Sequence, residues 1–588
     1  MSLRMQAAAW GAGGTAAVVL CLSLAARWYV STEQTVYWWD YVQWWNFSAT
    51  LLNDYRQSPT AAARSVVRSF SRDYTLIPAI PTAAWCGLFG QSRMAFVTGL
   101  AAIYGGMLIV SSCLTTLAAT QTADRQQRAW AAAVAAIFAL CWPLPFGVSM
   151  RGFVDCGAAA IACFILWLFF SAPLSRLPLW RCISIGCLLA LLFLFRRYWS
   201  FWIVAFGLFV VLDTAWEGWK SRGAGLQPLL RLLLRPLVIG GMAAATLLVF
   251  ASPMVLRVLR TNYADVYAAY QFAGTSGWWD RVPRLVGGVI RVNGLVYTAA
   301  GLVSLGYLVA LPAYRRTGLA LATLAVLPLL LFLQVQAPGL HHHLLWSTSL
   351  MLATAVAAVD GIARLQSTAS RHADRWAIAA VTGITLVAGS QWAAAIVPAA
   401  APLRPWLLTG SGQLPLVRHD LAELDRLIEA IDSEAIARQG KVRIYCLASS
   451  ATLNAGILAA YAPSRQKLFR ASPMVAQTHD IDLRDGFPRP LITSNLLIVT
   501  DPVQVHQGTE HQQVIVVPNT QVLYGTGFGE AFQRLDWQFE LAVGVKVYLY
   551  ERVRPLTDSD LTALTDPLRQ AYPDRPDVWT YRPPSRNR

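Results

Sequence analysis

The sequence predicts an α-helical protein that crosses a membrane many times and ends in a small α/β domain outside the cytoplasm. Hydrophobic residues make up 55% of the 588 residues and charged residues only 14%, whereas charged residues are about 25% of an ordinary soluble protein. Long apolar stretches recur up to residue 402, and alternating polar and apolar segments follow from residue 403. Most of the surface of residues 1–402 is therefore expected to face lipid.

About eleven apolar windows approach the roughly 20 residues that a membrane helix needs. They lie near residues 7–27, 94–118, 129–147, 154–173, 180–195, 199–216, 236–252, 292–312, 317–334, 345–363 and 376–398. The first window is too long for the core of a signal peptide and lacks a small-residue cleavage site, so a retained helix is expected. The apolar stretch Leu76–Phe89 is broken by Pro78 and Pro81, which favours an interfacial or re-entrant helix.

The basic residues predict the orientation of the chain. With a cytoplasmic N-terminus every predicted inner loop contains Arg or Lys, as the positive-inside rule requires. Two long outer loops then cover residues 28–93 and 253–291. An odd number of spans places the α/β domain, residues 403–580, on the periplasmic side of a bacterial inner membrane. The polar, Pro-rich tail 581–588 is expected to be disordered.

The net charge of +16 favours contact with anionic lipid headgroups, because no nucleic-acid-binding motif accompanies it. Within residues 403–580, helices are expected at 420–432 and 453–461. Strands are expected at 442–447, 496–500 and 514–517, and an antiparallel pair at 537–543 and 545–550, joined at Gly544.

Ionisable side chains gather at the outer ends of the predicted spans, which indicates a site because such groups are costly near a bilayer. Asp40 lies in the aromatic run Tyr37–Trp45, directly after the first span. The other candidates are Arg72, Asp73 and Tyr74 in the first outer loop, Arg151 and Asp155 before the fourth span, Arg196, Arg197 and Tyr198 after the fifth, and His341, His342 and His343 after the ninth.

Each candidate also has a purely structural interpretation. Asp40 could cap a helix beside an aromatic belt, and the arginines at 196 and 197 could extend to lipid headgroups. The histidine run could be a polar turn rather than a metal site, because adjacent histidines point in different directions. Asp155 could pair with Arg151, four residues earlier on one helical face.

Several motifs occur in an order that can be compared with a known family. They are Ser71–Pro78, Leu88–Phe96, the Arg-then-Asp motif Arg151–Asp155, the basic turn Phe195–Tyr198 and the histidine run His341–His343. Together they resemble the polytopic GT-C glycosyltransferases, including protein O-mannosyltransferase-like and aminoarabinose-transferase-like enzymes. The resemblance covers roughly residues 1–400. The chain departs from the family pattern in two places. It lacks the Asp-Glu pair of the first loop, and it has Phe195–Tyr198 where relatives often have Thr-Lys-Gly.

The resemblance implies a GT-C-like membrane domain that transfers a sugar, with inversion, from a polyprenyl-phosphate donor to a glycan, lipid or protein acceptor at the outer membrane face. The attacking hydroxyl must lose a proton, so a carboxylate base is needed. Asp40 is the first candidate for this base and Asp73 the second.

The phosphate leaving group needs positive charge rather than a proton donor. The candidates for binding this phosphate are Arg196, Arg197, His341, His342 and His343. The residues expected to orient the substrate are Arg72, Tyr74, Arg151, Asp155 and Tyr198. A divalent cation such as Mg²⁺ or Mn²⁺ between carboxylates is left open.

Two other classes of protein fit the composition. A secondary transporter of an anionic or lipid-linked substrate would also need many spans with charged residues, but its site would lie near the midplane between internal repeats. No repeat is visible in the sequence, and the charged residues cluster at one face. A lipid-binding subunit without chemistry would retain the outer arginines and would not need Asp40.

Overall fold

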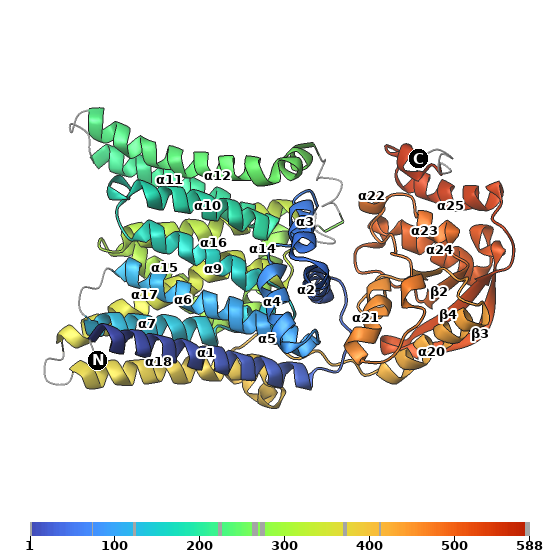
Figure 1. The fold of residues 1–588 in the computed structure, drawn as a ribbon, viewed down its shortest axis with the longest axis horizontal. Helices are drawn as coiled ribbons and strands as arrows, with labels where there is room; N and C mark the ends of the chain where they lie inside the picture. Colours follow the sequence, from blue (N-terminus) through green and yellow to red (C-terminus); the bar gives the residue numbers. More distant parts are fainter. Residues whose placement is uncertain are drawn as a thin grey trace. The chain divides into compact units, whose positions relative to one another are not determined.

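The computed structural model describes residues 3–72, 74–120, 125–220, 226–260, 269–270, 277–368, 373–410 and 413–581. The chain forms two compact units. Unit 1 comprises residues 1–32, 44–261 and 275–415. Unit 2 comprises residues 33–43, 262–274 and 416–588. Unit 1 is built from helices, and unit 2 combines helices with a small sheet (Figure 1).

The helices up to residue 220 begin with a long N-terminal helix. They are α1 (Leu3–Thr32), α2 (Asp40–Gln57), α3 (Pro59–Ser69), α4 (Ala79–Phe89), α5 (Arg93–Leu100), α6 (Gly106–Thr120), α7 (Arg125–Cys141), α8 (Pro143–Met150), α9 (Asp155–Phe170), α10 (Leu179–Phe195) and α11 (Ser200–Lys220). Helix α2 begins in unit 2 and continues in unit 1.

The remaining helices of unit 1 are α12 (Leu226–Arg260), α14 (Trp278–Asn293), α15 (Leu295–Ala310), α16 (Arg315–Val335), α17 (Leu344–Thr368), α18 (Ala373–Ile396) and α19 (Arg404–Leu407). The short turns η3 (Arg197–Trp199) and η4 (Leu340–His343) precede α11 and α17. The many apolar helices make this a multi-pass membrane protein.

The expected number of about eleven spans is too high. Within the described residues six helices are long and apolar enough to cross a membrane, or up to eight if each of two bent pairs is one span. The windows expected at 154–173 and 180–195 form helices of 16 and 17 residues. These helices are shorter than a full span because Pro173 and Pro178 lie in the connection between them, and proline has no amide hydrogen to donate within a helix.

Two expected spans are bent. The helix pair Gln126–Cys141 and Pro143–Met150 turns by 49°, where Pro143 removes a hydrogen-bond donor. The pair Trp279–Asn293 and Leu295–Ala310 turns by 108°. Gly294 at this second break has a φ of 85°, a conformation that favours glycine.

Unit 2 contains one mixed sheet of four strands, β1 (Ile444–Leu447), β2 (Leu496–Asp501), β3 (Phe532–Leu541) and β4 (Val545–Arg552), in the order β1-β2-β4-β3. Strands β1 and β2 are parallel, and the other two pairs are antiparallel. The hairpin β3–β4 confirms the antiparallel pair expected around Gly544, with a longer first strand.

The helices of unit 2 are α20 (Leu421–Ala437), α21 (Ala455–Arg465), α22 (Asp482–Asp485), α23 (Arg489–Thr493), α24 (Gln513–Tyr524) and α25 (Asp558–Ala571). The strand expected at 514–517 is wrong, because these residues open α24. The Asp482 carboxylate accepts hydrogen bonds from the backbone amides of Gln513 and Val514 at 2.9 and 2.8 Å. It thereby satisfies two donors that a helix start leaves open.

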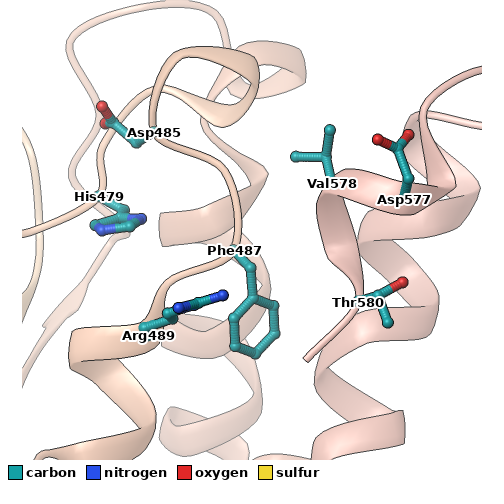
Figure 2. Close-up of a pocket in the computed structure, with 7 residues that line it drawn as sticks. All are labelled: His479, Asp485, Phe487, Arg489, Asp577, Val578 and Thr580. Carbon is teal, nitrogen blue, oxygen red and sulfur yellow. The ribbon is translucent and has the colours of Figure 1, made fainter. Parts of the chain in front are cut away.

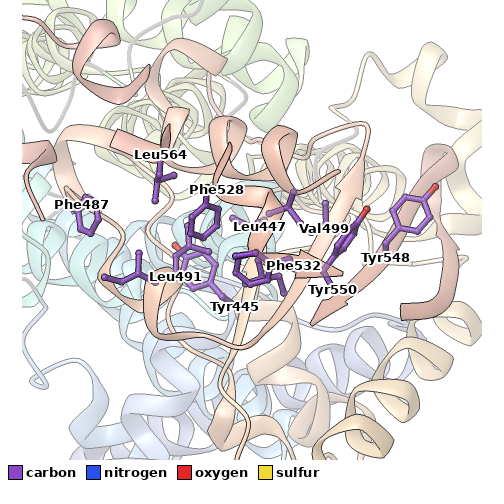
Figure 3. Packing of buried hydrophobic residues seen from close by; sticks show 14 residues of the cluster. Tyr445, Leu447, Phe487, Leu491, Val499, Phe528, Phe532, Tyr548, Tyr550 and Leu564 are labelled. Atoms are coloured by element: carbon purple, nitrogen blue, oxygen red, sulfur yellow. The ribbon is translucent and has the colours of Figure 1, made fainter. Parts of the chain in front are cut away.

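Both faces of the sheet are buried along β1, β2 and most of β4, whereas most side chains of β3 are exposed. On one face Tyr445, Leu447, Val499, Tyr548 and Tyr550 alternate along their strands and pack with Phe528, Phe532 and Leu564 (Figure 3). On the other face Ile444, Cys446, Ile498, Val547 and Leu549 are fully or almost fully buried. The continuous apolar strands therefore fit a sheet with helices on both sides.

Candidate functional site

A buried ion pair forms the centre of the candidate site in unit 1. Nε of Arg196 donates to Oδ1 of Asp155 at 2.8 Å, and both side chains are almost completely buried. The hydroxyl of Tyr198 donates to the same carboxylate oxygen. Removing one member of a buried pair leaves an uncompensated charge, which typically costs about 3–5 kcal/mol. Asp155 therefore compensates the buried positive charge of the Arg196 guanidinium and holds the guanidinium in one orientation.

Three aromatic rings surround the guanidinium of Arg196. Its Cζ lies 5.3 Å from the ring centre of Trp44, 5.6 Å from Tyr74 and 5.2 Å from Tyr198. These distances fall within the roughly 6 Å range of cation–π contacts. We call Asp155, Arg196, Tyr198, Trp44 and Tyr74 the arginine cluster.

The backbone brings these residues together from distant parts of the chain. Helix α10 ends at Phe195, and Arg196 has an extended conformation (φ −153°, ψ 111°) between α10 and η3. Helix α9 approaches α10 closely because Gly157 has no side chain. A Cβ there would lie 2.6 Å from the rings of Phe195 and Tyr104. The Thr75 hydroxyl donates to the carbonyl of Leu194 at 2.6 Å, which holds the segment of Tyr74 beside the end of α10.

The histidine run borders the arginine cluster. His341 stacks on Phe153 with ring centres 4.4 Å apart, and its carbonyl oxygen lies 3.3 Å from the Tyr198 hydroxyl. His342 packs edge-on against Tyr198 at 4.6 Å. Its Nδ1 accepts a hydrogen bond from the backbone amide of Gly339 at 2.9 Å. Nε2 of a neutral His342 therefore carries the proton and is a hydrogen-bond donor.

His343 faces a different direction from its two neighbours. Its ring contacts Trp346 at 5.0 Å, and it lies against Gly288 of α14. This divergence agrees with the expectation that adjacent histidines do not converge on one point. Within the described ranges no group of three or more His, Cys, Asp or Glu side chains is arranged to hold a metal ion.

Two further buried arginines lie near the start of α9. Arg151 caps the end of α8, and its Nη2 donates to the carbonyl of Leu414 at 2.6 Å. Asp155 begins the next helix, so the two residues do not lie on one continuous helical face as the i, i+4 interpretation assumed. Arg93, at the start of α5, packs over the rings of Trp45 and Phe96.

Asp40 is the first residue of α2, is half-buried and belongs to unit 2. A carboxylate at a helix N-terminus is favoured by the helix dipole, so its capping interpretation is compatible with its place. The preceding residue, Trp39, packs on His506 with ring centres 4.6 Å apart.

The other sequence candidates differ in their surroundings. Arg72 is exposed, and Arg197 is half-buried as the first residue of η3. Asp73 lies outside the described residues. The interpretation of Arg196 as a headgroup-seeking side chain is wrong, because its guanidinium is buried and paired with Asp155.

Unit 2 holds a Ser-His-Asp arrangement that the sequence did not indicate. The Ser449 hydroxyl lies 3.0 Å from Oδ2 of Asp480 and 2.9 Å from Nδ1 of His506. In a hydrolase triad the carboxylate binds Nδ1 and the nucleophile faces Nε2. Ser449 instead stands between the other two groups, so this arrangement does not have the geometry of a hydrolase triad.

Burial shapes the protonation of this second cluster. Burial raises the pKa of the Asp480 carboxyl, although the nearby positive charge of Arg484 acts to lower it. Burial also lowers the pKa of His506 against the attraction of Asp480. Both shifts favour the neutral forms, which suits a hydrogen-bonded structural cluster beside Trp39.

Sequence reasoning named Tyr74 and Tyr198 but missed two other aromatic residues of the site, Trp44 and Phe153. Trp44 lies in the aromatic run that drew attention to Asp40, yet it packs on Arg196. Phe153 lies inside the motif 151–155 and stacks on His341. The available signal was the presence of large aromatic residues directly beside the ionisable candidates.

Comparison with known proteins supports a fold assignment. No family model and no curated protein matches the chain. The crystal structure of ArnT from Cupriavidus metallidurans bound to undecaprenyl phosphate matches 91% of this chain and 98% of its own, with a TM-score of 0.50 and 12% identity. The apo structure of the same protein matches with a TM-score of 0.45 and 13% identity, over 92% of this chain and 98% of its own. The chain therefore has a GT-C-like fold.

Proposed function

We propose that this protein is an inverting glycosyltransferase of the bacterial inner membrane. It moves a sugar from a polyprenyl-phosphate donor to a glycan, lipid or protein acceptor at the outer face, where the α/β domain is periplasmic. The observation that carries the proposal is the arginine cluster, placed in a fold shared with a protein solved with undecaprenyl phosphate. A buried guanidinium held in a fixed orientation is a suitable partner for a phosphate.

The phosphate is proposed to bind beside Arg196, with Arg197 and the histidine run supplying further donors. Nε of Arg196 is engaged by Asp155, and a guanidinium carries five N–H donors in a planar fork. The three aromatic rings pack around this fork, and the Arg196 side chain is almost completely buried. Lower local polarity strengthens the attraction between the guanidinium and the phosphate charge that develops as the sugar leaves.

The reaction needs one base and no added oxidant or reductant. The acceptor oxygen bonds to the anomeric carbon while the bond from that carbon to the phosphate oxygen breaks. The hydroxyl proton passes to a carboxylate, and polyprenyl phosphate leaves with the bonding electrons. Asp40 is our first assignment for this base and Asp73 the second. Arg72, Tyr74, Arg151, Asp155 and Tyr198 are proposed to orient the groups.

The base assignment is tested by separate Asp40→Asn and Asp73→Asn variants of the full-length protein in lipid nanodiscs. The substrates are undecaprenyl-phosphate-linked glucose, galactose, mannose and aminoarabinose, offered with a bacterial envelope extract as acceptor. Asp40→Asn should lower turnover by about 10²- to 10⁴-fold, the usual contribution of a general base. Asp54→Asn, a half-buried carboxylate on the same helix α2, is the matched control and should keep normal turnover.

Full turnover in Asp40→Asn with loss in Asp73→Asn would move the base to Asp73. Product from no donor, or substrate movement across the bilayer without a new glycosidic bond, would overturn the glycosyltransferase proposal and favour a transporter.

A further inference from the structure

A pocket of about 420 Å³ lies within unit 2. It borders the Ser449 cluster through Asp485, which accepts from the backbone amide of Asp480, but Ser449, Asp480 and His506 do not line it, and it has no role assigned above. It is lined by His479, Asp485, Phe487, Arg489, Asp577, Val578 and Thr580 (Figure 2). This volume falls within the roughly 300–1,000 Å³ typical of small-molecule sites. The lining residues are mostly polar, which distinguishes the pocket from an acyl-chain site.

One wall of the pocket comes from residues 479–489. The ring of His479 lies between Asp485 and Arg489 on this wall (Figure 2). The Asp485 carboxylate is already used, because it accepts from the backbone amides of Asp480 and Ile481 at 2.9 and 3.0 Å and pairs with Arg484. Nδ1 of His479 lies 3.2 Å from the carbonyl of Gly486, which fixes the ring.

Arg489 contributes a positive charge that the rest of the described chain does not engage. Its side chain is exposed, and no hydrogen bond or ion pair of its guanidinium occurs among the residues that the structure describes. Phe487, two residues earlier, is almost buried and provides an apolar surface beside it (Figure 2). This wall therefore offers N–H donors next to an aromatic ring.

The opposite wall comes from η10 (Pro576–Trp579) and the residue after it. Asp577 and Thr580 supply a carboxylate and a hydroxyl, and Val578 lies beside Asp577 on the side towards the opposite wall (Figure 2). Asp577 is only loosely paired, with 3.8 Å between its Oδ1 and Nε of Arg575. Trp579, the last residue of η10, is fully buried against Val514, Ile515 and Leu568 and anchors the turn.

The two walls together suit an uncharged ligand with many hydroxyl groups. Asp577 would repel an anionic ligand, and Arg489 would repel a cationic one. An apolar ligand would displace water from both charged groups without replacing its hydrogen bonds, which costs free energy. A sugar hydroxyl can accept from the Arg489 guanidinium and donate to the Asp577 carboxylate. The apolar face of a sugar ring can also contact Phe487.

We propose that this pocket is a carbohydrate-binding site that recognises one or two sugar units. The site is separate from the transfer chemistry proposed above, and its occupation requires no donor. Binding of a sugar here can therefore be measured whether or not the protein transfers one.

The test is saturation-transfer difference NMR on the full-length protein in lipid nanodiscs. The probes are D-glucose, D-galactose, D-mannose and maltose, with acetate, propylamine and cyclohexanol as charged and apolar controls. Arg489→Gln and Asp577→Asn remove one charge from each wall and keep side chains of similar size. Arg443→Gln and Asp536→Asn change exposed residues of unit 2 that do not line the pocket and serve as matched controls.

We expect signal from at least one sugar and none from the three control compounds. Arg489→Gln and Asp577→Asn should each weaken that binding about tenfold, the equivalent of roughly 1.4 kcal/mol, while the control variants bind normally. An absence of signal from every sugar would overturn the proposal. So would binding of acetate or propylamine in place of sugars, or sugar binding that both pocket variants leave unchanged.

Discussion

Nε of Arg196 donates to Oδ1 of Asp155 at 2.8 Å, although the two residues are separated by 41 positions in the chain. Arg196 follows the end of α10, and Asp155 begins α9. The contact joins the ends of two helices and holds a buried positive charge in a fixed place. Several measurable properties should depend on it.

Asp155→Asn should weaken both the protein and its catalysis. The amide retains the shape of the carboxylate but leaves the Arg196 charge uncompensated, which is expected to cost about 3–5 kcal/mol. Thermal unfolding in detergent should show a clear fall in Tm. Asp536→Asn, an exposed carboxylate of β3, should leave Tm unchanged, and equal Tm values for the two variants would contradict a structural role for the pair.

Arg196→Lys should lower kcat/KM while the protein remains folded. Lysine keeps the charge but loses the planar group that packs between Trp44, Tyr74 and Tyr198. A loss of about 1.4 kcal/mol corresponds to a tenfold lower kcat/KM. Arg315→Lys changes an exposed arginine at the start of α16 and should have normal kinetics. Full activity in Arg196→Lys would show that charge alone is sufficient.

Gly157→Ala should disturb the approach of α9 to α10. The added Cβ would lie 2.6 Å from the rings of Phe195 and Tyr104, and such overpacking typically costs about 1–3 kcal/mol. We expect a lower Tm and weaker transfer, because the start of α9 carries Asp155. Gly207→Ala is the control, since a Cβ there meets nothing within 4 Å. Unchanged behaviour of both variants would refute the close-packing argument.

The pH dependence of unit 2 should be visible at helix α25. A hydrogen bond from Arg554 holds the pKa of Asp560 at about 2, below its ordinary value of 3.8. A carboxyl whose pKa is lowered by folding stabilises the folded form above pH 3.8 and loses this effect as pH falls towards 2. Hydrogen exchange of residues 558–571, corrected for intrinsic rates, should therefore accelerate in that window.

Asp560→Asn should remove most of this pH dependence and lower the local opening free energy by about 1 kcal/mol, because the capping interaction with Thr557 is weakened. Asp566→Asn, on the same helix and half-exposed, should behave as the unchanged protein. Identical pH profiles for Asp560→Asn and the unchanged protein would show that another group controls α25.

The sequence predicted the elements whose signal is local. Apolar stretches marked the long helices, and alternation around Gly544 marked the hairpin β3–β4. The segment 514–517 was misassigned because its β-branched residues favour a strand, whereas the Asp482 carboxylate, 32 positions before Val514, caps it as a helix. The number of spans was overestimated because hydropathy does not register that the helices on either side of Pro173 and Pro178 have only 16 and 17 residues, nor that two other spans bend at Pro143 and Gly294.

The candidate site could be predicted only as a set of residues. Composition and spacing placed Asp155, Arg196 and Tyr198 among the candidates, but they did not indicate that one carboxylate oxygen serves both partners. The nearest partner in sequence, Arg151, lies on a separate helix end. Contacts of Trp44 and Phe153 depend on tertiary packing, which a single sequence does not encode in any local pattern.

The most direct test of the account is binding of undecaprenyl phosphate to the full-length protein, measured by native mass spectrometry beside undecaprenol, which lacks the phosphate. We predict that undecaprenyl phosphate binds at least about tenfold more tightly. We also predict that Arg196→Gln removes this preference, while Arg315→Gln retains it. Equal binding of the two lipids, or a preference that Arg196→Gln leaves unchanged, would contradict the assignment of the arginine cluster to the donor phosphate.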